Sequence, residues 1–129
     1  MISDAEMIKN AHSVCENAYA PYSKFKVGAC VLFESGKYYL GCNVENASFG
    51  LSLCAERNAI SNAIADGETT KLVKIAIVSE NTSFCFPCGA CRQWFSEFCT
   101  PDFQVIVEDD NKSPVSYSMK DILPNSFKL

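Results

Sequence analysis

The spacing of apolar residues divides the chain into alternating helices and strands. The first predicted helix covers residues 4–19 and ends before Pro21, since proline cannot continue a helix. It begins with a capping-box pattern at Ser3 and Glu6. Its apolar residues then recur at helical spacing, at Ile8, Ala11, Cys15 and Ala18.

A hairpin and a second helix follow. Residues 27–34 and 37–43 are rich in β-branched, aromatic and other apolar residues and flank Ser35-Gly36, so we predict two antiparallel strands. An apolar stripe predicts a helix over residues 55–65, which ends at Asp66-Gly67. The near-continuous apolar run of residues 73–79 predicts a buried strand.

The last part of the chain predicts one more helix and two strands. The helix begins near Pro87 and extends to Thr100-Pro101, with an aromatic stripe that indicates core packing: Trp94, Phe95 and Phe98. The strands cover residues 103–107 and 115–118. The link between them is too short for a crossover helix, so we predict that they pair antiparallel. Residues 119–123 predict one short helical turn.

The order of these elements indicates an α/β fold. Helices alternating with strands call for a three-layer α-β-α sandwich around a mixed five-stranded sheet. A chain of 129 residues is long enough for one sizeable core, so we expect a single domain over residues 1–129.

Charge narrows the classes of partner. The net charge is −4, the isoelectric point is near 4.9 and no run of Lys or Arg occurs, which disfavours nucleic acid and anionic membranes as partners. The first residues lack the pattern of an export signal, and no apolar stretch is long enough to span a membrane. We expect a soluble cytoplasmic protein with a small, weakly charged substrate.

The cysteines belong to two groups. Eight cysteines would suit a secreted disulfide scaffold, but a reducing compartment favours metal binding or catalysis by clustered cysteines. The isolated ones lie among apolar neighbours and are predicted to pack as small apolar residues: Cys15, Cys30, Cys42 and Cys99. The only histidine, His12, has no ligand-type neighbour and is expected at a solvent-exposed edge.

Three other cysteines form a metal-binding pattern. Cys54 immediately precedes one predicted helix, and Cys88 and Cys91 lie at the start of another. Helix N-termini favour thiolate over thiol, and three thiolates leave the fourth corner of tetrahedral zinc open to water. The pattern predicts one catalytic Zn²⁺ per chain.

Two residues next to Cys54 are candidates for the chemistry. A carboxylate beside an ionisable water suits hydrolysis, which makes Glu56 a candidate catalytic residue, although glutamate is also common in the first turn of a helix. The guanidinium of Arg57 could donate to a ligating sulfur, or it could face solvent.

A closed structural zinc site is the main alternative. Cys85 precedes the second cysteine pair and could supply a fourth thiolate. However, it comes before the proline at the predicted helix start, so we expect it on the incoming loop. Cys54 also lacks the closely spaced partner that is typical of structural zinc knuckles.

Several segments, in this order, resemble the small homotetrameric type of zinc-dependent cytidine deaminase. The resemblance covers nearly the whole chain and is carried by residues 21–29 (PYSKFKVGA), 41–48 (GCNVENAS), 54–57 (CAER) and 87–93 (PCGACRQ). It implies a cytidine deaminase-like fold and hydrolytic deamination of cytidine and 2′-deoxycytidine in pyrimidine salvage. Glu56 would move protons between water, N3 of the base and the departing amine.

The resemblance also implies substrate contacts. Asn43 and Glu45 would bind the ribose, in particular its 3′-hydroxyl. Phe25 would pack against the pyrimidine, and the backbone N–H of Ala55 would hold the base carbonyl. Phe127 would close over the site of a neighbouring subunit in a homotetramer.

This chain departs from many relatives at two places. Phe49 stands where they carry tyrosine, and Trp94-Phe95 replaces smaller aliphatic residues. These changes concern substrate preference and subunit packing, and neither touches the metal-binding pattern.

Other functions stay open at this point. Deamination of a polynucleotide or of an antibiotic nucleoside is one alternative, and a structural zinc or interaction module is another. The acidic composition disfavours a polynucleotide substrate.

Overall fold

A mixed sheet of five strands forms the centre of the fold. The computed structural model describes all 129 residues, and its sheet has the order β2-β1-β3-β4-β5. The strands are β1 (Gly28–Phe33), β2 (Tyr38–Cys42), β3 (Leu72–Val78), β4 (Cys99–Glu108) and β5 (Pro114–Ser118). Only β3 and β4 pair in parallel. The predicted mixed sheet and the antiparallel final pair are confirmed.

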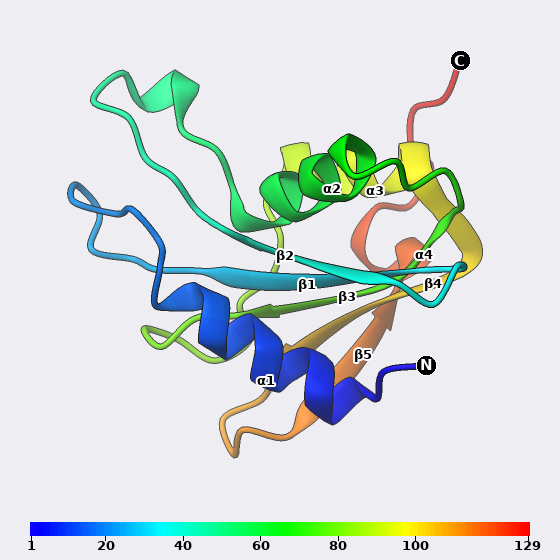
Figure 1. Cartoon of the computed structure of the whole chain (residues 1–129), viewed down its shortest axis with the longest axis horizontal. Coiled ribbons are helices and arrows are strands. Elements are labelled where there is room, and N and C mark those ends of the chain that lie inside the picture. The colour runs from blue at the N-terminus through cyan, green and yellow to red at the C-terminus, as the bar shows by residue number, and fades with distance from the viewer.

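Helices cover both faces of the sheet (Figure 1). Helix α1 (Asp4–Cys15) packs on one face, while α2 (Ala55–Ala65) and α3 (Gly89–Phe98) lie side by side on the other. The short α4 (Met119–Ile122) follows β5. Two separate buried clusters, one on each face, join the helices to the sheet. This arrangement confirms the predicted three-layer sandwich.

Glycine permits unusually close contact between α2 and the sheet. A Cβ atom on Gly41 in β2 would lie 2.4 Å from the backbone nitrogen of Ala59 and 2.5 Å from the carbonyl oxygen of Ala55. Any side chain at position 41 would therefore push α2 away from β2. The absence of a Cβ atom thus sets the height at which the first turn of α2 lies above the sheet.

The boundaries of several elements differ from the prediction. Helix α1 ends at Cys15 instead of residue 19, because Tyr19 pairs with the segment after β2: its N–H donates to Asn43 (3.0 Å) and its carbonyl accepts from Glu45 (2.8 Å). Ser3 caps α1 by accepting a hydrogen bond from the Glu6 N–H. The 3₁₀ turn η1 (Phe49–Leu51) was not predicted.

Helix α3 and strand β4 meet without a loop. The helix begins at Gly89 and ends at Phe98, and β4 starts directly at Cys99 instead of residue 103. The strand therefore contains Pro101, which lies where the register against β3 shifts. A proline is tolerated there because a bulge needs no ladder hydrogen bond from its nitrogen.

Two side chains lie in surroundings other than those expected. Trp94 is 36% exposed, so only Phe95 and Phe98 of the predicted aromatic stripe pack in the core of this chain. His12 is not free at the surface, because its ring nitrogens lie 2.6 Å from Glu80 and 2.5 Å from Glu108. Both carboxylates come from strand ends far away in the sequence, which explains why the sequence did not indicate this contact.

The four isolated cysteines follow the prediction in part. All eight cysteines are free thiols in the structure, and Cys15 and Cys30 are fully buried. Cys99 is half-buried against the core, whereas Cys42 is half-buried and belongs to neither buried cluster. No helix in the structure has the length and apolar character needed to cross a lipid bilayer.

Candidate active site

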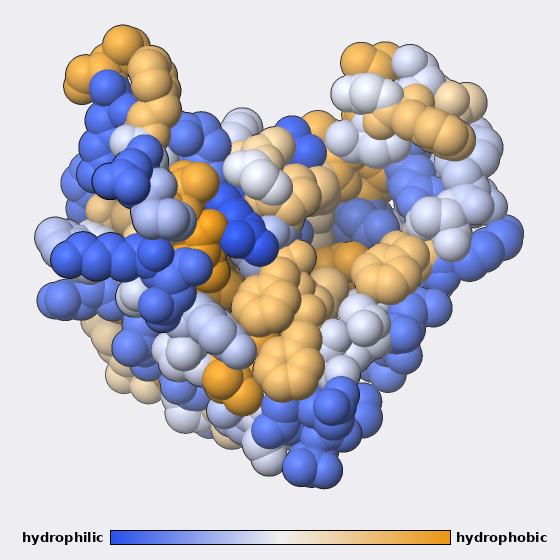
Figure 2. Space-filling view, turned by 180° about the vertical axis from the view of Figure 1, so that it is seen from behind, coloured by the Kyte–Doolittle hydropathy of each residue, from blue (hydrophilic) through white to orange (hydrophobic).

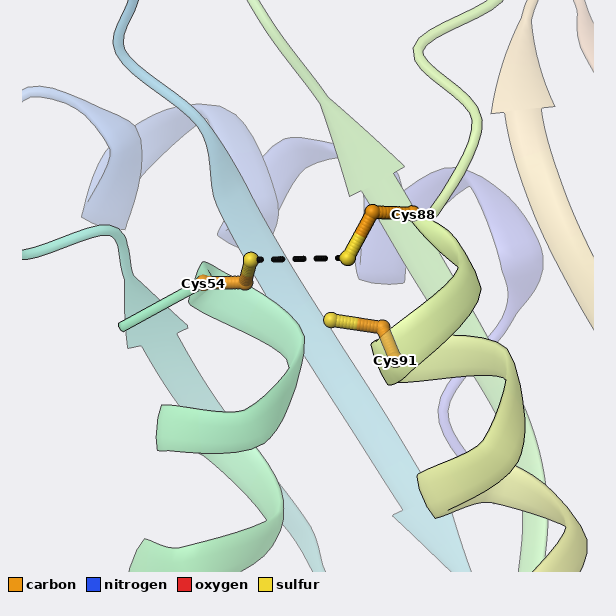
Figure 3. Close-up of side chains that lie close together, drawn as sticks. All are labelled: Cys54, Cys88 and Cys91. Carbon is orange, nitrogen blue, oxygen red and sulfur yellow. Dashed lines mark hydrogen bonds between the residues drawn. The ribbon is translucent and has the colours of Figure 1, made fainter. Parts of the chain in front are cut away.

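Three thiols converge where the N-terminal ends of α2 and α3 meet (Figure 3). Cys54 is the N-cap residue of α2, Cys88 is the N-cap residue of α3, and Cys91 lies in the first turn of α3. Their sulfur atoms all lie within 4.8 Å of one another. Unpaired backbone N–H groups at both helix ends point toward this cluster and favour negative charge on it.

The geometry of the cluster fits zinc. Cys54 Sγ and Cys88 Sγ are 3.8 Å apart. Four ligands held at about 2.3 Å around tetrahedral zinc are separated by about 3.8 Å, so this edge already has the required length. Cys54, Cys88 and Cys91 are therefore positioned to hold a zinc ion with one coordination position left open.

The charge state of the thiols also fits a cation. A hydrogen bond from the Cys91 thiol, followed by contributions from Arg57 and Cys88, lowers the pKa of Cys54 to about 5. The same hydrogen bond raises the pKa of Cys91. A cation bound between these sulfurs would stabilise both as thiolates in place of this hydrogen bond.

Arg57 lies next to this cluster, in contact with Cys54. Its Nη2 donates to Cys54 Sγ at 3.3 Å, while its Nε is buried without a partner. Of the two roles considered from the sequence, the structure places Arg57 against a ligating sulfur and not in solvent. A donor in this position draws electron density from the thiolate and orients it.

Cys85 does not join the cluster. Its sulfur is not among the ligand atoms that lie within 4.8 Å of one another. Desolvation by burial raises the pKa of Cys85 to about 12, so its thiol stays protonated at neutral pH. The arrangement of four sulfurs that a closed structural zinc site requires is therefore not present.

A cavity of about 260 Å³ opens next to the three cysteines. Glu56 lines it and is only 4% exposed, and this burial raises the pKa of its carboxyl to about 7. A carboxyl with this pKa can both accept and release a proton near neutral pH. Ala55, the first residue of α2, lines the same cavity with its backbone at the helix N-terminus. A larger hollow near Tyr19 and Lys26 contains none of these groups.

The same cavity is also lined by three of the predicted substrate residues: Phe25, Asn43 and Glu45. The Asn43 amide accepts from the Val27 N–H and donates to the Phe25 carbonyl, both at 2.8 Å. The Glu45 carboxylate accepts hydrogen bonds from the loop that contains Ser23. These two side chains thus hold the loop that carries Phe25 against the end of β2.

Two aromatic residues expected near the substrate do not line this cavity, and one residue that does line it was not predicted. Phe127 is 69% exposed and does not line the cavity of its own chain. Phe49 is also exposed and packs against Tyr22 instead of lining the cavity. Phe86 and Cys85 do line it, although no sequence pattern selected Phe86. The position of Phe86, directly before Pro87 and Cys88, is the one signal that could have indicated it.

Comparison with known proteins agrees with this geometry. Residues 1–107 match the family described as the cytidine and deoxycytidylate deaminase zinc-binding region. Cytidine deaminase from Halalkalibacterium halodurans is 40% identical over 121 residues, which cover 94% of this chain and 91% of that protein. The one from Sporosarcina psychrophila is 37% identical over 122 residues, or 95% and 89% of the two chains.

A solved structure shows the same fold. The crystal structure of cytidine deaminase from Burkholderia pseudomallei superposes with a TM-score of 0.89 at 41% identity, covering 98% of this chain and all of that one. The zinc-binding cluster, the acid at its side and these matches over nearly the full length agree. This chain belongs to the family of zinc-dependent cytidine and deoxycytidylate deaminases.

Proposed function

We propose that this chain catalyses the hydrolytic deamination of free cytidine and 2′-deoxycytidine to uridine and 2′-deoxyuridine, with release of ammonia, as a step of pyrimidine salvage. We further propose that residues 1–129 act as one catalytic domain. The observation that carries the proposal is the position of Glu56, buried in the same cavity that Cys54 and Cys88 of the three-cysteine cluster line.

The reaction adds water at C4 of the base and expels the amino group. When bound, zinc supplies an acidified water at its open coordination position. Glu56 accepts a proton from the attacking water and delivers it to N3 of the base. It then takes the remaining proton from the new C4 hydroxyl and gives it to the amino group, which leaves as ammonia as the C4–N bond breaks and the C4 carbonyl forms. Its pKa near 7 suits both directions of transfer, and its burial excludes competing bulk water.

The walls of the cavity support a nucleoside substrate. In the proposed complex the Ala55 N–H donates to the base carbonyl and the Phe25 ring packs against the pyrimidine. Asn43 and Glu45 bind a sugar hydroxyl. Support for these roles is that all four residues line one cavity with the cysteine cluster.

A homotetramer would complete the site. Figure 2 shows apolar side chains gathered in a hollow on one face of the chain, between two raised parts. Large apolar residues are exposed in this chain, among them Phe49, Leu51 and Phe127. Exposed apolar surface of this kind is typical of protein interfaces. We propose that Phe127 of one subunit closes the cavity of another.

The proposed location is the cytoplasm. The three zinc ligands must be reduced to bind metal, and the structure holds all eight cysteines as free thiols. A reducing compartment maintains this state. The acidic composition, with a net charge of −4, supports a free nucleoside and disfavours nucleic acid or an anionic membrane surface as a partner.

Ammonia release tests the proposed function. The purified, zinc-loaded protein is incubated separately with cytidine, 2′-deoxycytidine, cytosine, adenosine and a cytosine-containing oligonucleotide. We expect ammonia and a matching ultraviolet change from the first two substrates only. Turnover of the oligonucleotide alone, or of none of the five, would contradict the proposal.

A further inference from the structure

The Glu45 carboxylate is held by a network that extends well beyond the cavity. Its Oε1 accepts backbone hydrogen bonds from Tyr22 (3.0 Å) and Ser23 (3.1 Å). Its Oε2 accepts from the Ser23 hydroxyl. The same hydroxyl oxygen accepts the N–H of Phe25 at 3.0 Å. Ser23 therefore connects two residues that line the cavity, although it does not line the cavity itself.

The hydrogen bonds that Glu45 already accepts determine how many more its carboxylate can accept. Each carboxylate oxygen has about two acceptor positions. Both positions on Oε1 are taken by backbone N–H groups, and one position on Oε2 is taken by Ser23. Glu45 is thus left with a single free acceptor position, on Oε2.

Asn43 offers the complementary group. Its amide oxygen accepts from Val27 and one of its two amide hydrogens goes to the Phe25 carbonyl. One N–H donor remains free on the Asn43 amide. Together, Asn43 and Glu45 present one donor and one acceptor, which is the pair that a single hydroxyl group satisfies, because a hydroxyl both accepts and donates.

We propose that Ser23 is a positioning residue of the sugar site, and this proposal rests on the proposed nucleoside deaminase function. Its hydroxyl fixes Glu45 Oε2 so that the remaining acceptor position faces one sugar hydroxyl. The same hydroxyl also accepts the Phe25 N–H and so fixes the backbone of Phe25. Lys24, between Ser23 and Phe25, has a positive φ of 60°. This backbone conformation costs free energy, so the loop depends on the hydrogen bonds of Ser23 to keep its shape.

Charge supports this arrangement. The hydrogen bond from the Ser23 hydroxyl is the largest cause that lowers the pKa of Glu45, followed by the backbone hydrogen bond from Ser23. The carboxylate consequently stays ionised and remains a strong acceptor for a hydroxyl group. Lys24 lowers the pKa further.

The test combines a variant with a truncated substrate. Ser23→Ala is compared with the unsubstituted protein on cytidine and on 3′-deoxycytidine, which lacks the hydroxyl assigned to this site. We expect kcat/KM for cytidine to fall about tenfold through KM, with kcat little changed, as for the loss of one hydrogen bond to a charged group. For 3′-deoxycytidine we expect a decrease of less than about threefold, since the sugar contact is already missing and only the smaller effect through Phe25 remains.

Controls separate positioning from a general loss of structure. Ser23→Thr keeps a hydroxyl and should restore most of the KM, whereas Ser61→Ala, an exposed serine on α2 without a side-chain hydrogen bond, should behave like the unsubstituted protein. Equal decreases on both substrates, a decrease in kcat alone, or no decrease would overturn the positioning role. Failure of the unsubstituted protein to deaminate cytidine would instead refute the proposed function itself.

Discussion

Among single residues, Glu56, the proposed catalytic residue, shows how its surroundings change the acidity of an ordinary side chain. It is the second residue of α2, where a glutamate would normally face solvent and complement the helix dipole. Here it is 4% exposed, and burial raises its pKa to about 7. Burying a charged carboxylate costs free energy. Carboxyl groups in cavities whose pKa is shifted by burial are typical of active sites.

Replacing Glu56 with glutamine tests that role. Glu56→Gln keeps the shape of the side chain but removes its ability to move protons. We expect turnover of cytidine to fall by at least about 10²–10⁴-fold, the usual contribution of a general acid/base. Zinc content, measured by metal analysis, should not change. Glu97→Gln, at an exposed position of α3, serves as the matched control, and near-normal turnover of Glu56→Gln would contradict the assignment.

In the proposed site, Arg57 acts on the zinc ligand Cys54 and does not touch the substrate. Its hydrogen bond to Cys54 Sγ draws electron density from a ligand set that is otherwise rich in negative charge. We expect Arg57→Gln to lower kcat about 10- to 100-fold at full zinc occupancy, the range found for groups that orient metal ligands. Arg57→Lys should recover part of the loss, because it keeps the charge. Full turnover of Arg57→Gln in a steady-state assay would argue for a solvent-facing role.

At the scale of elements, the site depends on how α2 and α3 sit on the sheet. All three zinc-binding cysteines lie at or within one turn of a helix N-terminus, so a small shift of either helix separates the sulfurs. The height of α2 is set by its backbone contact with Gly41 of β2. On the opposite face, Gly28 of β1 permits an equally close contact with α1.

Two glycine variants separate what the two faces of the sheet contribute to stability from what they contribute to zinc binding. Gly41→Ala places a Cβ atom 2.4 Å from the Ala59 nitrogen, and Gly28→Ala places one 2.0 Å from the Ala11 carbonyl oxygen. We expect each to lower the free energy of unfolding by about 1–3 kcal/mol or more, measured with denaturant. Only Gly41→Ala should also weaken zinc binding, because α2 carries Cys54.

Gly50→Ala is the control for the glycine variants, since a Cβ atom at position 50 would have no other atom within 4 Å. It should change neither stability nor zinc affinity appreciably. Zinc affinity that is lowered equally by Gly41→Ala and Gly28→Ala would show that the position of α2 is not what matters.

The sequence predicted those elements and residues whose signals are local. The helix over residues 55–65 was correct to the residue, because its apolar stripe and its Asp66-Gly67 exit lie within the segment. The three cysteines and Glu56 were selected because their spacing at two helix starts is itself a chemical pattern. Their arrangement in space is determined by how the N-terminal ends of α2 and α3 pack together.

Features set by contacts between distant segments could not be predicted in this way. Helix α1 stops early because Tyr19 pairs with residues beyond β2, and β4 begins early because its bulge accommodates Pro101. The hydroxyl of Ser23 meets a carboxylate 22 positions away, so its role depends on the folded loop. His12 between two carboxylates from strand ends is a further case.

For the whole molecule, we propose that one chain does not complete the site and that Phe127 of a neighbouring subunit closes it. It lies near the C-terminus, its carbonyl accepts a hydrogen bond from Gln93 at 3.1 Å, and its ring is largely exposed. In the proposed homotetramer, with a mass of four times 14.2 kDa, this ring covers the cavity of a neighbour. Light scattering on a sizing column measures that mass directly.

Mixing one impaired and one inactive variant tests whether sites are shared between subunits. Phe127→Ala should lower activity at unchanged zinc content, and Glu56→Gln should be inactive for its own reason. Mixed tetramers should regain activity, because a Phe127→Ala subunit keeps Glu56 and receives an intact Phe127 from its Glu56→Gln neighbour. Mixed tetramers that form, as mass spectrometry would show, but stay inactive would contradict the shared site.

The central claim is that three sulfurs hold the metal and leave one position open for chemistry. X-ray absorption at the zinc edge of the fully reduced, substrate-free protein counts the sulfur atoms around the ion. We predict three sulfurs at about 2.3 Å and one lighter ligand. Four sulfurs, with Cys85 as the additional ligand, would show a closed structural site and contradict the account.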